Sequence, residues 1–374
     1  MEYQYYEFQA IDRPLTKDEQ VYIESLSSRV KLSTMGAVFT YSYGDFYGDP
    51  LSVLEECFDT MLYMANWGSY QLAFRFPKST VNIPALESYC IDNIIEVSTT
   101  AKHVILNIEI HDEEGGGWIE EHNNWLSSFI PLRQAILQGD YRVLYLAWLQ
   151  AAAVSSYLED NIQEPPVPPN LQQLNAPLQS FIDWLEIDSD LIAVAIQVSQ
   201  TKQKPKEPFQ DWINALSDEE KTKLLLEIVA GNSAIATQLQ THLRHKFFPA
   251  LELPPVSNLA RRNFSELKAL AEIQRLERQT QEKATAKAKR YQYLESLKPQ
   301  QIQIWETIKD LISRKQAKPY EQAIRHLIDL RDLAELESNS TIFQSRIRQM
   351  QADYSTRSGL LKRMREAKLL KDKN

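Results

Sequence analysis

Cysteine is scarce in this chain of 374 residues, which holds only Cys57 and Cys90. Two thiols cannot form a disulfide framework, and they are too few for a cysteine-rich zinc site. Cytosolic proteins commonly keep such isolated thiols reduced. We therefore expect a cytoplasmic protein without structural disulfides.

Long apolar runs are also missing. The longest such stretch, residues 143–158, is interrupted by Gln150 and is short for a membrane span. The opening MEYQYYEF has neither the basic nor the apolar region of a signal peptide. We expect no membrane partner, and we interpret 143–158 as a buried core helix.

Familiar catalytic motifs are absent as well. The sequence contains neither a P-loop nor the G-x-S-x-G pattern of a serine hydrolase. Cys57 lies in the middle of an apolar helical pattern, which favours a core thiol over a nucleophile. No motif implies a cofactor, and an enzyme is the less favoured interpretation.

Charge is divided unevenly along the chain. Residues 1–260 contain 16 Lys and Arg against 35 Asp and Glu, a net charge of −19. Residues 261–374 contain 25 Lys and Arg against 15 Asp and Glu, a net charge of +10. Such a division indicates different partners for the two parts, or one part that binds the other.

The first 120 residues predict a small α+β domain built on a mixed sheet. The aromatic segment 3–11 stops before Pro14, which favours a strand, and Thr16 and Glu19 have the spacing of a capping box that opens a helix. Further strands are expected at 37–43 and 70–77 and as a pair within 93–114, with helices at 17–29 and 50–67. We expect helices packed on one sheet rather than a doubly wound fold.

The rest of the sequence has helical periodicity. Proline-rich breaks at 164–170 and 249–258 separate the helical segments. We therefore divide the chain into an α+β domain (1–120), a helical domain (121–250) and a basic helical region (260–374). The last region should hold a long polar helix and, at 299–337, one helix pair that resembles a tetratricopeptide hairpin. Its heptad pattern does not persist, which gives little support to a long coiled coil.

Two groups of motifs resemble known families. The segments YYEFQAIDRPLT, YGDFYGDP and YMANWG resemble an uncharacterised family of bacterial proteins. The C-terminal segments YEQAIRHLIDLRDLAE and FQSRIRQMQADYSTRSGLLKRM are similar to the helical tail of some bacterial SWIM zinc-finger proteins. The zinc-binding C-x-C and C-x-H elements of that family are missing here, so its nucleic-acid function does not carry over. The resemblance implies a bacterial, cytoplasmic protein without an assigned role.

Acidic residues near two turns suggest a metal-dependent hydrolase as one hypothesis. Its candidate ligands are Asp45, Asp49, Glu109, His111 and Asp112, which offer hard oxygen atoms and an imidazole. Turn and helix-cap chemistry explains the same residues, because Asp49 precedes Pro50 at a helix start. Asp12, at the end of the first strand, likewise fits a strand-to-helix corner better than a catalytic site.

Basic runs near the C-terminus give the leading hypothesis. The residues concerned, in 283–290 and 362–373, are Lys287, Lys289, Arg290, Lys362, Arg363 and Arg365. They predict a non-enzymatic interaction or scaffold protein whose helices bind a protein partner or a second copy by charge complementarity. Phosphate binding to nucleic acid through the same helices is the alternative, and a merely solvated helix face is the third interpretation.

Overall fold

A computed structural model describes residues 2–111, 125–154, 162–202, 208–229, 239, 243, 246–247 and 261–370; within 208–229 it leaves out the side chains of residues 227 and 228. The chain forms two compact units, Met1–Arg275 and Leu276–Asn374. We call them unit 1 and unit 2 and describe each by itself. No helix in the described part of the chain is long and apolar enough to cross a membrane.

Unit 1 is built on a seven-stranded sheet with the strand order β2-β3-β1-β4-β5-β7-β6. The strands are β1 (Gln4–Gln9), β2 (Lys31–Leu32), β3 (Gly36–Tyr41), β4 (Thr60–Ala65), β5 (Ser69–Pro77), β6 (Ile95–Thr99) and β7 (His103–His111). Each neighbouring pair is antiparallel. The α+β class is as expected, with an antiparallel sheet in place of a mixed one.

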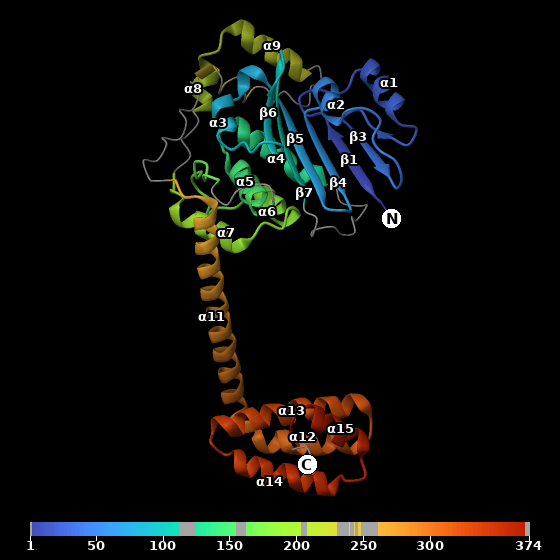
Figure 1. Cartoon of the computed structure of the whole chain (residues 1–374), viewed down its shortest axis with the longest axis vertical. Coiled ribbons are helices and arrows are strands. Elements are labelled where there is room, and N and C mark those ends of the chain that lie inside the picture. Colours follow the sequence, from blue (N-terminus) through green and yellow to red (C-terminus); the bar gives the residue numbers. More distant parts are fainter. Residues whose placement is uncertain are drawn as a thin grey trace. The chain divides into compact units, whose positions relative to one another are not determined.

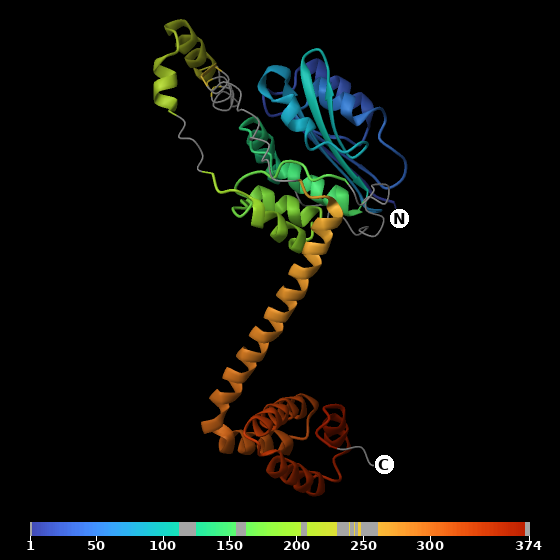
Figure 2. The ribbon, with the colours of Figure 1, turned by 60° about the vertical axis from the view of Figure 1, so that its left-hand side comes forward.

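Helices cover both faces of this sheet (Figures 1 and 2). The helices α1 (Lys17–Leu26) and α2 (Pro50–Cys57) pack on the face that carries Phe8 and Met61. The opposite face carries Leu62 and Phe74 and is covered by α3 (Ile83–Glu87), α4 (Trp125–Leu137), α5 (Arg142–Val154), α6 (Ala176–Trp184) and α7 (Ser189–Val198). Because side chains alternate along a strand, successive residues of β4 feed two separate cores.

One predicted element is wrong. The apolar pattern of 50–67 predicts a single helix, but α2 ends at Cys57 and Thr60–Ala65 forms β4. β4 lies between β1 and β5 and is buried on both faces, so its sequence is almost continuously apolar. A run of this kind fits a helical and a buried-strand pattern equally well.

The described helix starts follow their local signals, and the predicted break at 249–258 lies outside the described residues. Thr16 and Glu19 form the predicted capping box of α1, and Ser217 exchanges equivalent bonds with Glu220 before α9 (Asp218–Val229). Gly139 separates α4 from α5 with a positive φ of 76°, which glycine adopts without strain. The remaining described helix of this region is α8 (Phe209–Asn214).

The core of unit 1 extends beyond the predicted first domain. One continuous hydrophobic cluster joins the strands to α4–α7 and to the first residues of α11 (Phe264–Leu297), including Phe264 and Leu267. Predicted domains 1–120 and 121–250 therefore share buried side chains, and the boundary between the two compact units falls inside α11.

Unit 2 has a hydrophobic core of its own. The predicted helix pair is present as α12 (Gln301–Ser313) and α13 (Ala317–Leu336), followed by α14 (Ser340–Asp353) and α15 (Ser358–Glu366). Ile308, Leu327, Ile347 and Leu360, one from each helix, meet in this core. Each helix has a narrow apolar stripe that is buried only when the helices associate.

Candidate functional site

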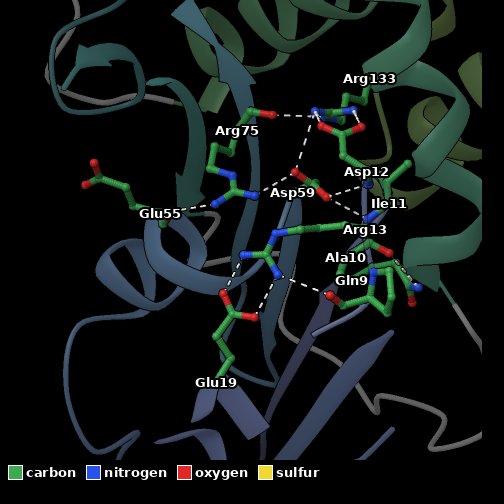
Figure 3. Close-up of polar contacts among 11 residues, drawn as sticks. Gln9, Ala10, Ile11, Asp12, Arg13, Glu19, Glu55, Asp59, Arg75 and Arg133 are labelled. Atoms are coloured by element: carbon green, nitrogen blue, oxygen red, sulfur yellow. Dashed lines mark hydrogen bonds and ion pairs between the residues drawn. The ribbon is translucent and has the colours of Figure 1, made fainter. Parts of the chain in front are cut away.

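A cluster of paired charges in unit 1 lies where β1 leads into α1 (Figure 3). Arg133 reaches this corner from α4 and donates two hydrogen bonds to the Asp12 carboxylate, at 3.1 and 2.8 Å. Its Nε also donates to the main-chain carbonyl of Arg75, at 2.9 Å. Asp12 therefore pairs with a residue 121 positions away in the sequence.

Asp59, between α2 and β4, is the centre of the cluster. Its carboxylate accepts the backbone N–H groups of Ile11 and Asp12, at 2.6 and 2.9 Å. It also accepts a hydrogen bond from Arg75 at 2.8 Å and lies 3.7 Å from Arg133. Burial acts to raise the pKa of Asp59, but the two guanidinium groups outweigh it and lower this pKa.

This cluster is balanced in charge and well supplied with hydrogen bonds. Two buried arginines face Asp12 and Asp59, and the neighbouring Arg13 pairs with Glu19, whose pKa falls to about 2 mainly through that hydrogen bond. Buried charges paired in this way fix the positions of their chain segments. We interpret the cluster as a clamp that joins β1, β4, β5 and α4.

The acidic residues proposed for a metal are distributed over several elements. Asp49 caps α2 by accepting the N–H of Ser52 at 3.0 Å, and Asp45 accepts a hydrogen bond from Gln4 at 3.1 Å. Glu109 and His111 lie together, with Oε1 and Nε2 3.3 Å apart. Asp112 lies outside the described residues. Among the residues that are described, no three His, Cys, Asp or Glu side chains are placed to hold a metal ion.

Glu109 and His111 have a further neighbour that the sequence pattern does not reveal. Ser69 Oγ lies 3.0 Å from His111 Nδ1, which gives the contact order Ser–His–Glu of a proton relay. Ser69 is directly opposite His111 in the β5–β7 register, and Glu109 is on the same face two residues away. Because Ser69 is only 6% exposed, we interpret the three residues as a cross-strand polar pairing.

Neither cysteine has the character of a nucleophile. Burial raises the pKa of Cys57 and of Cys90 to about 11, so both remain thiols at neutral pH. This agrees with the expected role of Cys57 as a core residue, because its side chain lies among those packed between α1, α2 and the sheet.

The predicted basic residues of unit 2 differ in how far they are already paired. Arg290 is held by Asp329 at 2.7 Å and by Asp332 at 2.6 Å. Lys287 and Lys289, in the same stretch of α11, are exposed and form no ion pair with any residue in the described part of the chain. The run 283–290 thus keeps only part of its positive charge available to a ligand.

α15 separates its apolar and cationic residues clearly. Leu360, Leu361 and Met364 are buried in the core of unit 2. Lys362 and Arg365 are exposed on the other side, where Lys362 has one distant acidic neighbour, Glu366 at 3.9 Å. We call the exposed side of α15 with Lys362 and Arg365 the α15 face.

Arg363 has a different place in the same helix. It lies 3.6 Å from Glu321 of α13 and donates to the Gly359 carbonyl at 3.1 Å. Of the three candidates in α15, Arg363 thus belongs partly to the packing of the unit, whereas Lys362 and Arg365 are directed toward solvent.

Comparisons with protein-family models, with curated proteins and with solved structures found no match to this chain. The assignment of a role therefore depends on the geometry and charge described above.

Proposed function

We propose that the chain is a non-enzymatic interaction protein, and that unit 2 binds an acidic surface of a partner protein through the α15 face. The single observation that supports this proposal most is the arrangement of α15. A buried apolar side fixes the helix, while Lys362 and Arg365 are exposed; among the described residues Arg365 takes part in no ion pair, and Lys362 has only the exposed contact with Glu366 at 3.9 Å.

The charges of unit 1 contrast with this arrangement. Arg75, Arg133 and Arg262 are held by carboxylates within their own unit. Charges that are already paired and desolvated contribute to folding, whereas solvated charges of one sign remain available to attract a partner and raise its rate of association. These three arginines of unit 1 therefore support its fold, whereas Lys362 and Arg365 share one exposed helix side in unit 2.

Nucleic acid is the second candidate ligand. The pairing of Arg290 weakens the case for nucleic-acid binding by residues 283–290. Of the three cations proposed in 283–290, Arg290 already has two aspartates within 2.7 Å. Affinity for a phosphate backbone grows with the number of phosphates that cations neutralise. The pairing of Arg290 therefore lowers the affinity that this stretch could have for a phosphate backbone.

The test is affinity capture with the full chain from nuclease-treated lysate, followed by identification and purification of the captured protein. The double variant K362E/R365E should weaken binding of that purified protein by at least about tenfold, because it reverses two charges at the contact. The control K17E/K31E makes the same change in net charge on exposed lysines of unit 1 and should bind as the wild type does.

Two results would contradict the proposal. One is equal binding by K362E/R365E and the wild type at low salt. The other is a wild-type chain that binds an RNA or DNA oligonucleotide with a steep salt dependence and loses this binding in K287E/K289E. The second result would assign the basic helices to nucleic acid.

A further inference from the structure

The contact between Glu109 and His111 on β7 is longer than a direct hydrogen bond between these groups. His111 Nε2 lies 3.3 Å from Glu109 Oε1. A charge-assisted hydrogen bond from a nitrogen to a carboxylate is commonly about 2.7–2.9 Å long. In the part of the chain that the structure describes, Glu109 forms no ion pair with a lysine or arginine. His111 is therefore its one charged neighbour there.

The same separation fits two ligands of one metal ion. Zinc binds a histidine nitrogen and a carboxylate oxygen at about 2.0–2.1 Å, and at the tetrahedral angle these two atoms lie about 3.3 Å apart. Side chains two residues apart on a strand point to the same face of the sheet, so β7 holds Glu109 and His111 side by side. The pair thus has the spacing that one ion requires.

Ser69 of β5 holds the imidazole of His111 from its other side. Ser69 lies directly opposite His111 in the β5–β7 register, and its Oγ is 3.0 Å from Nδ1. When the Nδ1–H group donates to this oxygen, Nε2 carries a lone pair that is free to bind a metal. Metal-binding histidines usually donate their second ring N–H to an oxygen in this way, which fixes the ring and its tautomer.

Gln71 has the corresponding place beside Glu109. Its Nε2 donates to Asn107 Oδ1 at 2.9 Å and lies 3.4 Å from Glu109 Oε2, so it contacts the carboxylate oxygen that is not directed at His111. Gln71 and Asn107 are both buried. The ligand side chains themselves remain accessible, because 61% of the His111 side chain and 36% of the Glu109 side chain are exposed.

We propose that Glu109 and His111 bind a divalent transition-metal ion, for which Zn²⁺ is the probe. His111 Nε2 and Glu109 Oε1 are the ligands, and Ser69 and Gln71 are positioning residues. An imidazole nitrogen suits zinc, copper or nickel, whereas magnesium prefers oxygen ligands alone. Two protein ligands are fewer than the three of a catalytic zinc site, so water fills the remaining positions of the ion.

This site goes beyond the proposed function, because it lies in unit 1 and shares no residue with the α15 face of unit 2. The variant K362E/R365E should therefore bind zinc as the wild type does. Conversely, a chain without Glu109 and His111 should bind an acidic partner as before.

Titration of the metal-free full chain with zinc, in competition with a chromophoric zinc indicator, tests the site. H111A and E109Q should each weaken binding at least about tenfold, because each removes one of two protein ligands. S69A should weaken it about tenfold, at the lower end of the usual effect of such a supporting residue. S69T keeps the hydroxyl and should bind zinc as the wild type does. An excess of Mg²⁺ should not compete.

A matched control makes the titration specific. H103A/E56Q changes the same two residue types elsewhere in unit 1, at the other end of β7 and on the exposed side of α2. It should bind as much zinc as the wild type does, whereas H111A/E109Q should lose one site. Because the difference between variant and wild type is counted, zinc bound elsewhere in the chain does not affect the result.

Three outcomes would overturn the proposal. The first is the same zinc affinity and number of sites in the wild type and H111A/E109Q, which would leave the two residues as an ordinary ion pair. The second is zinc binding that H111A loses but E109Q keeps unchanged. The third is an equal loss in H103A/E56Q. Capture of a partner through the α15 face would still stand in each case.

Discussion

Arg133→Met removes the residue that ties α4 to the β1–α1 corner. In the wild type, the Arg133 guanidinium makes two bonds to Asp12 and one to the Arg75 carbonyl, and it lies over the Phe76 ring at 5.5 Å. Methionine keeps the apolar contact with Phe76 but supplies neither charge nor donors. The Asp12 carboxylate and the Arg75 carbonyl then lose the hydrogen bonds that Arg133 donates.

The loss of stability in R133M depends on which hydrogen-bond partners Asp12 and Asp59 keep. Removal of one member of a buried ion pair costs roughly 3–5 kcal/mol. Asp59 keeps Arg75 and two backbone N–H donors, and Asp12 is about one-third exposed and can bind water. We therefore expect a loss of about 3 kcal/mol in the free energy of unfolding, at the lower end of that range.

Urea unfolding followed by tryptophan fluorescence measures this loss, because six of the seven tryptophans lie in unit 1. R29M removes an exposed arginine of the same unit and should change stability by less than about 0.5 kcal/mol. D12N combined with R133M should cost less than the sum of the single changes, because both remove the same contact. A loss below about 1 kcal/mol in R133M would refute the clamp.

Two other predictions concern buried carboxylates. The pKa of Asp59 is lowered, so its contribution to stability is complete above its ordinary pKa and is lost as the pH falls through the folded-state value. The urea midpoint of D59N should therefore fall less steeply than that of the wild type between pH 5 and pH 3. An equally steep fall of the midpoint in both proteins would contradict this. Arg262, which lies just before α11, donates two hydrogen bonds to Glu164, at 2.8 and 2.7 Å. R262M should destabilise unit 1 by about 3 kcal/mol and speed amide exchange at Glu164 and Phe264, whereas R278M, in an exposed pair, should do neither.

Local sequence signals predicted local structure well. Thr16 and Glu19, three residues apart, form the capping box, and Asp49 before Pro50 caps α2 as expected. Glu109 and His111, two residues apart in β7, lie on one face, as the alternation of strand side chains requires. In each case the partners are close in sequence, so spacing alone fixes which groups can meet.

Contacts between distant segments could not be predicted in the same way. The pairing of Asp12 with Arg133 requires α4 to pack on the sheet, and the pairing of Ser69 with His111 requires the register of β5 and β7. β4 was missed because burial on both faces removes the alternation that identifies a strand. These features depend on tertiary packing, which a single sequence pattern does not encode.

Charged side chains are paired to different extents in the two units. In unit 1, Asp12 and Asp59 became structural once Arg133 and Arg75 were found beside them. In unit 2, two aspartates hold Arg290, whereas Arg365 takes part in no ion pair among the described residues and Lys362 only in an exposed one with Glu366. A solvated cation on a helix that is fixed by its apolar side attracts an approaching acidic surface. We therefore keep binding by unit 2 as our proposal, and exposed Lys362 and Arg365 are the residues that support it.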